Sequence, residues 1–174
     1  QPKGAIVRHS AWIAQTNNSL AQLPAIGIGD VVLAVAPMAH FGGSIGLNCT
    51  VRGAATIAVA KFDATSTLEM VVEHGVTILP LAPIMLRSLV EETSRGLQQS
   101  ALNTLRAIPY GGSPTDSATL VTAATRFPHC LVQYYGLSEA LAPLASLSAG
   151  EHDSAAGDIL NGRNTFQPNR INWS

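Results

Sequence analysis

The sequence predicts an α/β fold in which a mostly parallel sheet carries helices on both faces. Short apolar runs rich in β-branched residues recur along the chain, and amphipathic helical patterns separate them. Runs that are apolar on both faces are typical of strands buried on both sides of a parallel sheet. Regular alternation of strand and helix also implies right-handed crossover connections. We therefore expect a β-α-β alternation between Asp30 and Gly136.

The strands are predicted at the short apolar runs. Four of these runs are clear and one is weaker, because an arginine interrupts it. The clear runs are residues 31–35, 55–59, 76–79 and 130–132, and the weaker one is 105–108.

Helical patterns fill the intervals between these runs. Ala64, Leu68 and Val71 share one helix face, Asp63 or Ser66 can cap that helix, and Gly75 follows its end. Further helices are predicted around residues 85–90 and 120–124, after prolines that suit a helix start, and an amphipathic helix is predicted over 10–23.

Composition argues against several classes of protein. Charged residues make up 12% of the 174 residues, about half the usual share of about 25%. The formal net charge of −1 argues against nucleic-acid binding and against a polybasic membrane patch. We expect no transmembrane segment, because the apolar runs are far shorter than a membrane span. We expect Cys49 and Cys130 to be buried thiols in a reducing compartment, which favours a cytoplasmic location.

One standard catalytic motif is present. Gly42-Gly43-Ser44-Ile45-Gly46 matches the G-x-S-x-G nucleophile elbow of hydrolases, with His129 or His152 as base and Asp116 to orient it. Five residues separate the apolar run from this motif, whereas an elbow turns directly off its strand. The alternative is a turn of small residues that opens a packed helix.

Ligands of open parallel sheets bind beyond the carboxyl ends of the strands. The segments that follow the predicted strands are rich in glycine and aromatic residues. Glycine allows a flat ligand to approach the backbone, and tyrosine can stack on a base. These segments are residues 37–43, 80–83, 110–114 and 133–139.

Three motifs stand at the start of the chain and in these segments: Pro2-Lys3-Gly4, Gly111-Gly112-Ser113-Pro114 and Tyr135-Gly136-Leu137-Ser138-Glu139. Together they resemble motifs of the adenylate-forming, AMP-binding superfamily, which includes the acyl-CoA synthetases. Pro2-Lys3-Gly4 resembles the close of its phosphate loop, and Tyr110-Gly111-Gly112-Ser113-Pro114 resembles its G-G-x-P turn. Tyr135-Gly136-Leu137-Ser138-Glu139 resembles its Y-G-x-T-E signature, with serine in place of threonine. Pro37-Met38-Ala39-His40 resembles its P-x-x-H. The resemblance covers roughly residues 1–147.

The resemblance implies an acid–CoA ligase that uses ATP, Mg²⁺ and coenzyme A. Such an enzyme joins a carboxylic acid to AMP with release of pyrophosphate, and then transfers the acyl group to coenzyme A. By this resemblance, Glu139 would ligate Mg²⁺, Ser138 would hydrogen-bond the α-phosphate, and Lys3 would help to hold the phosphate loop. Fatty or aryl acids are favoured over amino acids.

The resemblance also implies the residues around the adenine and the acid. Tyr135 would stack on the adenine, with Gly111, Gly112, Ser113 and Gly136 also in the nucleotide site. His40 would face the acyl pocket near the carboxylate, with Gly111 alongside. Tyr134 could line that pocket or pack in the core.

We expect residues 1–156 to form part of an AMP-binding domain and residues 157–174 to be an irregular or divergent tail. The first residue is not methionine, so the chain is expected to be a piece of a longer protein. We expect these 174 residues alone to be catalytically inactive. A non-catalytic module that retains part of a nucleotide site is a further alternative.

Overall fold

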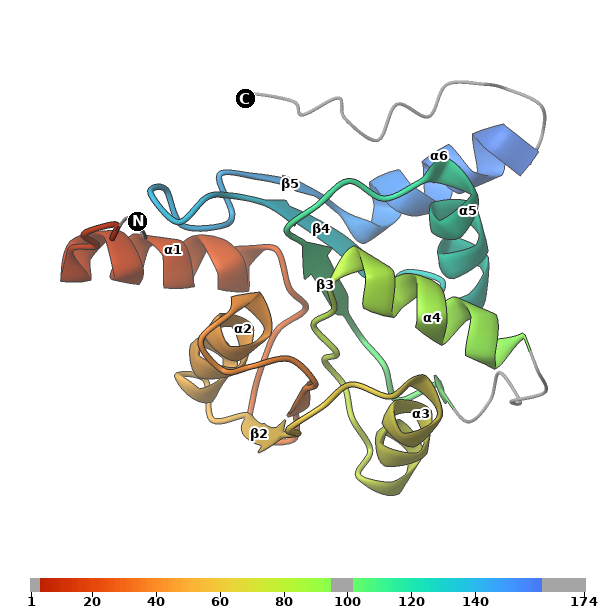
Figure 1. Cartoon of the computed structure of the whole chain (residues 1–174), viewed down its shortest axis with the longest axis horizontal. Helices are drawn as coiled ribbons and strands as arrows, with labels where there is room; N and C mark the ends of the chain where they lie inside the picture. The colour runs from red at the N-terminus through yellow and green to blue at the C-terminus, as the bar shows by residue number, and fades with distance from the viewer. Residues whose placement is uncertain (1–3, 95–101, 161–174) are drawn as a thin grey trace.

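A computed structural model describes residues 4–94 and 102–160, and its helices and strands alternate along most of the chain (Figure 1). The elements are α1 (His9–Ala21), β1 (Val31–Ala34), α2 (Phe41–Thr50), β2 (Ala55–Ala58), α3 (Ala64–Glu73), α4 (Pro83–Thr93), β3 (Ile108–Gly111), α5 (Ser117–Arg126), β4 (Leu131–Tyr135), β5 (Ala145–Leu147) and α6 (Ala149–Leu160).

The strands form two small sheets that one connecting segment joins. β1 pairs with β2 in parallel, β3 pairs with β4 in parallel, and β5 adds to β4 in the antiparallel direction. Residues 77–81, here called the bridging segment, lie between β1 and β3. Leu33 N–H donates to the Ile78 carbonyl at 3.0 Å, and Leu81 N–H donates to the Pro109 carbonyl at 2.9 Å. The spatial order is therefore β2, β1, bridging segment, β3, β4, β5.

The predicted strand at 76–79 forms isolated bridges instead of a regular ladder. These bridges join Ile78 to Val32 and to Ala107, and Leu81 to Tyr110. Pro80 has no N–H to donate, and a proline inside a sheet removes one ladder hydrogen bond. The segment therefore occupies the place of a central strand without the continuous pairing of one.

Two strands lie further along the chain than predicted. β3 occupies Ile108–Gly111 instead of 105–108, and β4 occupies Leu131–Tyr135 instead of 130–132. The apolar runs end at a proline and a glutamine, but the buried tyrosines Tyr110 and Tyr134 continue the strands. Residues that were expected just after strands are thus the last residues within them.

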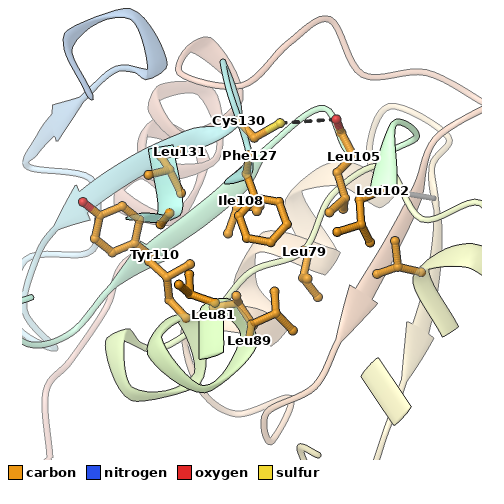
Figure 2. Packing of buried hydrophobic residues seen from close by; sticks show 14 of the residues in the cluster. Leu79, Leu81, Leu89, Leu102, Leu105, Ile108, Tyr110, Phe127, Cys130 and Leu131 are labelled. Carbon is orange, nitrogen blue, oxygen red and sulfur yellow. Dashed lines mark hydrogen bonds between the residues drawn. The ribbon is translucent and has the colours of Figure 1, made fainter. Parts of the chain in front are cut away.

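Side chains from alternate strand positions enter two cores on opposite faces of the sheet. Val32 of β1 packs in one core with residues of α2, whereas Leu33 packs in the other with residues of α3, α4 and α5. Figure 2 shows the second core, with Leu81, Leu89 and Tyr110 among its members. The prediction of helices on both faces is confirmed.

The helix ends follow their local chemistry. Asp63 caps α3 by accepting a hydrogen bond from the Ser66 N–H at 2.9 Å, and Gly75 follows this helix with a left-handed φ of 59°. Pro83 lies in the first turn of α4. Helix α1 differs from its expected amphipathic pattern, because its buried residues are the polar Gln15 and Ser19.

The end of the described chain is more regular than predicted. Strand β5 and helix α6 were not expected, and α6 continues through Leu160, so residues 157–160 are helical rather than irregular. The Ser148 hydroxyl and the Glu151 carboxylate form a reciprocal cap at the start of this helix. The rest of the expected tail, 161–174, lies outside the described residues. Within the described residues, no helix is long and apolar enough to cross a membrane.

A buried carboxylate anchors the bridging segment at its first residue. Asp30 is 4% exposed and accepts hydrogen bonds from the Thr77 hydroxyl at 2.8 Å and the Arg106 guanidinium at 2.6 Å. The Gly27 N–H donates to its other oxygen at 2.9 Å. Burial raises the pKa of Asp30, but these donors outweigh burial and hold the pKa below the ordinary value of 3.8. Asp30 therefore ties β1, the bridging segment and the start of β3 together.

We predict that Asp30→Asn lowers the free energy of unfolding by about 2 kcal/mol, because one buried charged acceptor is lost from several donors. Arg106 is 40% exposed, which keeps the loss below that of a fully buried pair. Urea unfolding measures the change. The exposed pair Arg87–Glu91 supplies the control, since Glu91→Gln should cost at most about 0.5 kcal/mol.

The pKa of Asp30 also fixes how its contribution to the free energy of unfolding changes with pH. The pKa of Asp30 is lowered on folding, so its contribution is present above the ordinary pKa of 3.8 and is lost as the pH falls below it. The difference between wild type and Asp30→Asn should shrink in that acid range. A difference that stays constant as the pH falls would contradict this role for the carboxylate.

Candidate functional site

The expected site segments gather at the carboxyl edge of the sheet. β1 leads into residues 35–40, the bridging segment leads into α4, β3 leads into residues 112–116, and β4 leads into residues 136–144. Since parallel strands end at the same edge, these connections lie at the edge where open α/β sheets bind ligands.

Gly111 and Gly112 shape the end of β3. Gly111 is paired with Tyr134 of β4, and a Cβ at this position would overlap the Tyr134 carbonyl oxygen. Gly112 has a left-handed φ of 97° and open space around it, and Ser113 is exposed. We call Gly111, Gly112 and Ser113 the glycine strip, and its backbone is open to a flat ligand beyond Gly111.

The two tyrosines at the end of β4 have different surroundings. Tyr134 is 2% exposed, and its hydroxyl donates to the Ser19 carbonyl of α1 at 2.6 Å. The rings of Phe41 and Tyr134 meet edge to face at a centroid distance of 5.8 Å. Burial raises the pKa of the Tyr134 phenol. Tyr135, in contrast, is 42% exposed, so its ring is free to stack on a ligand.

The loop after β4 carries the candidate phosphate and metal ligands. A Cβ on Gly136 would lie 2.5 Å from the Ala142 Cα, so the two ends of this loop pack closely. The Leu137 N–H donates to the Ala140 carbonyl at 2.9 Å, which leaves Ser138 and Glu139 at the tip, where both are exposed.

Those two side chains fit Mg²⁺ in one specific manner. Mg²⁺ prefers oxygen ligands and is usually bound by one or two carboxylates together with substrate phosphates. Glu139 offers a carboxylate and Ser138 a hydroxyl. Among the described residues, no group of three or more His, Cys, Asp or Glu could hold a metal ion. One carboxylate beside one hydroxyl is a donor set of the kind that Mg²⁺ completes with substrate phosphates.

His40 lies where β1 connects to α2. It is the N-cap residue of α2 and is exposed, and its carbonyl accepts the Ser44 N–H at 3.1 Å. A Cβ on Gly43 would overlap the Met38 carbonyl, so the loop before His40 folds onto the helix. The neighbouring Phe41 contacts the ring of Tyr134 in β4.

The hydrolase alternative finds no support in this arrangement. Ser44 lies within α2, and its hydroxyl donates to the Phe41 carbonyl at 2.8 Å. His129 pairs with Asp153, and both ring nitrogens of His152 have partners elsewhere. Asp116 caps α5 through the Thr119 N–H. The hydrogen bonds and ion pairs of these four candidate residues are thus made with other groups and not with one another.

The remaining candidates from the sequence are Lys3 and the two cysteines. Lys3 lies outside the described residues. Cys49 and Cys130 are buried free thiols, as predicted. Burial raises the pKa of Cys49 to about 12 and that of Cys130 to about 11, so neither is a thiolate at neutral pH.

A buried polar pair behind the glycine strip was not predicted. The Tyr110 hydroxyl lies 2.7 Å from Nε2 of His152, and both residues are almost completely buried. The sequence offered His152 as a possible base for Ser44, and the structure places it against Tyr110 instead. The S-x-x-E pattern at Ser148 is the signal that would have placed it in the first turns of a helix.

Comparison with known proteins identifies relatives over most of the chain. A family model described as AMP-binding enzyme matches residues 1–163. A medium/long-chain fatty-acid–CoA ligase of Mycobacterium tuberculosis is 30% identical over 88% of this chain and 26% of its own length. A 2-succinylbenzoate–CoA ligase of Arabidopsis thaliana is 31% identical over 85% of this chain and 27% of its own length.

The fold also matches a solved structure. An o-succinylbenzoate CoA synthetase from Bacillus subtilis, in complex with its acyl-adenylate intermediate, superposes with a TM-score of 0.74. It is 25% identical, and the match covers 91% of this chain and 31% of that one. The chain thus spans about a quarter of the length of these curated relatives.

We predict that Gly111→Ala lowers the free energy of unfolding by about 3 kcal/mol, because the added methyl group must separate β3 from β4. Gly112→Ala should cost only about 1 kcal/mol, since it meets open space and strains only the left-handed backbone. Urea unfolding of the two variants makes the comparison, and equal losses would contradict the close approach at Gly111.

We predict an acid-dependent loss of stability from His152. Burial lowers its pKa below the ordinary 6.5, against the opposing effects of the Ser148 carbonyl, Asp153 and Glu151. Above pH 6.5 the folded and unfolded states both hold it neutral. Below that value the unfolded state binds a proton more readily, so stability falls with pH by up to about 1.4 kcal/mol per unit.

Urea unfolding between about pH 8 and about pH 5 measures this slope. His152→Gln should remove the slope that His152 contributes, whereas the exposed His74→Gln should keep it. An unchanged slope in His152→Gln would show that other groups cause the acid dependence.

Proposed function

The chain belongs to the family of AMP-binding enzymes, and we propose that the whole protein activates a carboxylic acid with ATP. In the proposed reaction, a carboxylate oxygen attacks the α-phosphorus, the bond to the β-phosphate oxygen breaks, and pyrophosphate leaves. The thiol of coenzyme A then attacks the acyl carbon, AMP departs, and the thiol proton passes to solvent. The observation that carries this proposal is the joint exposure of Tyr135, Ser138 and Glu139 at and after the end of β4, the strand paired with the one that leads into the glycine strip.

Each of these residues has a proposed role in nucleotide binding. Tyr135 stacks on the adenine, the glycine strip lies along its other side, and Gly136 lets the backbone turn closely beneath it. The Ser138 hydroxyl donates to the α-phosphate, where negative charge builds up as pyrophosphate leaves. Glu139 holds Mg²⁺, which when bound neutralises charge on the phosphate oxygens. Lys3 remains a proposed contributor to the phosphate loop.

The acid is proposed to bind between His40 and the Gly111 end of β3. Tyr134 contributes its ring there rather than its hydroxyl, because the hydroxyl is already bonded to α1. The paired rings of Phe41 and Tyr134 favour an apolar or aromatic acid. The names of the fatty-acid and succinylbenzoate ligases among the relatives agree with a fatty or aryl acid, and we propose that class.

We predict that Glu139→Ala in the whole protein lowers the rate of ATP–pyrophosphate exchange at least about a hundredfold, because transition-state charge loses its compensation. The matched control is Glu73→Ala, an exposed glutamate at the end of α3, which should exchange as the wild type does. Full exchange in Glu139→Ala would remove Glu139 from the proposed site.

We propose that the 174 residues alone are inactive, since they span about a quarter of the curated relatives. The same exchange assay on the isolated chain tests this. Exchange that Glu139→Ala abolishes in the isolated chain would refute inactivity. AMP binding without exchange by the whole protein would instead support a non-catalytic nucleotide-binding module.

A further inference from the structure

The Tyr110–His152 pair joins a helix to the strand that ends in the glycine strip. Tyr110 is fully buried in β3, and His152, 2% exposed, lies in α6. The hydroxyl oxygen and Nε2 are 2.7 Å apart, and the two rings meet edge to face at a centroid distance of 5.6 Å. This contact links residues 42 positions apart in the chain.

The direction of the hydrogen bond follows from the other ring nitrogen. Nδ1 of His152 lies 2.7 Å from the Ser148 carbonyl oxygen, which can only accept. Nδ1 must therefore carry the proton, and Nε2 of the neutral ring accepts from the Tyr110 hydroxyl. In this arrangement the Tyr110 hydroxyl and both ring nitrogens of His152 have hydrogen-bond partners. If the tyrosine turned away, the buried Nε2 would be left without a donor.

The helix that carries His152 is itself held in place. The Ser148 N–H and hydroxyl each donate to the Glu151 carboxylate at 2.7 Å, which caps the first turn. Asp153, the next residue, pairs with His129 at 2.6 Å, just before β4 begins. His152 therefore presents Nε2 from a helix whose first turn is capped and whose next residue, Asp153, is paired with His129 before β4.

Tyr110, which is held by His152, is next to the glycine strip in the chain. It directly precedes Gly111, whose backbone lies against the Tyr134 carbonyl, and Gly112, whose φ is left-handed. Glycines have no side chains to hold them, and they adopt many conformations when unconstrained. The nearest side-chain anchor in the strand is the Tyr110 hydroxyl.

We propose that Tyr110 and His152 are positioning residues that hold the glycine strip in the geometry that accepts the adenine of ATP. This inference rests on the proposed function for the identity of the ligand. It differs from a purely structural role because it places the effect on nucleotide affinity rather than on the acid or on overall stability.

The test uses Tyr110→Phe in the whole protein, which removes one hydroxyl and keeps the ring. We expect the KM for ATP to rise about tenfold, as the loss of one buried hydrogen bond would predict, with the KM for the acid changed less than about twofold. His152→Leu should give the same pattern. His152→Gln, whose amide oxygen can still accept from the tyrosine, should recover part of the ATP affinity.

His129→Gln is the matched control, because it removes a second side-chain contact of α6, the one between Asp153 and His129 just before β4 begins. It should leave the KM for ATP unchanged. Equal increases in the KM for ATP and for the acid, or the same increase in His129→Gln, would reduce Tyr110 and His152 to a structural role and overturn the proposal.

A second measurement does not depend on activity. Amide hydrogen exchange at Gly111, Gly112 and Ser113 should become faster in Tyr110→Phe without nucleotide, while the amides of β1 and β2 keep their protection. If the wild-type protein neither exchanges pyrophosphate nor binds ATP, the proposed function fails and the amides alone decide the positioning. Unchanged amide exchange at the glycine strip, or an unchanged KM for ATP in an active protein, overturns the inference.

Discussion

Every connection at the candidate site depends on the contact between the two halves of the sheet, and that contact is the bridging segment of residues 77–81. Its backbone pairs with β1 on one side and with β3 on the other. Pro80 and Pro109 prevent a continuous ladder there, so side-chain contacts must supply part of the registration. Asp30 does so at one end through Thr77 and Arg106, and the packing of Leu79 and Leu81 in the larger core does so further along. Without this registration, the sheet that leads to His40 would not be held beside the sheet that leads to the glycine strip.

The low number of buried charged groups also determines where the polar groups of the site lie. Strands that are covered on both faces hold few ionisable groups, and Asp30 is a buried exception that needs several donors. The exposed polar groups of the candidate site lie instead in the connections at the carboxyl edge, among them Ser138 and Glu139. The two consecutive tyrosines at the end of β4 differ in burial. Tyr134 is buried and bonded to α1, while Tyr135 is exposed, as expected where side chains alternate between the faces of a strand.

Local chemistry allowed much of this fold to be predicted. Aspartate and proline at helix starts, glycine after α3 and apolar runs at β1 and β2 each act within a few residues, and the structure agrees with them. Predictions of strand ends and helix faces failed where polar or amphipathic side chains are buried in the core. Tyr110 and Tyr134 extend strands beyond the apolar runs, α1 buries Gln15 and Ser19, and the capped helix α6 lies where few apolar residues were recognised.

The sequence by itself determined the alternation of strand and helix, and hence the edge of the sheet at which Gly111, Gly112, Tyr135 and Glu139 would gather. It did so because helix periodicity, strand burial and the chain direction of parallel strands are local or topological properties. Only the tertiary structure decided that Ser44 lies inside a helix with its hydroxyl bonded to the Phe41 carbonyl, and that Tyr134 bonds to α1. It also decided that His152 supports Tyr110 from a distant helix. These outcomes depend on which side chains meet across the core, and partners separated by tens of residues leave no periodic signal in one sequence.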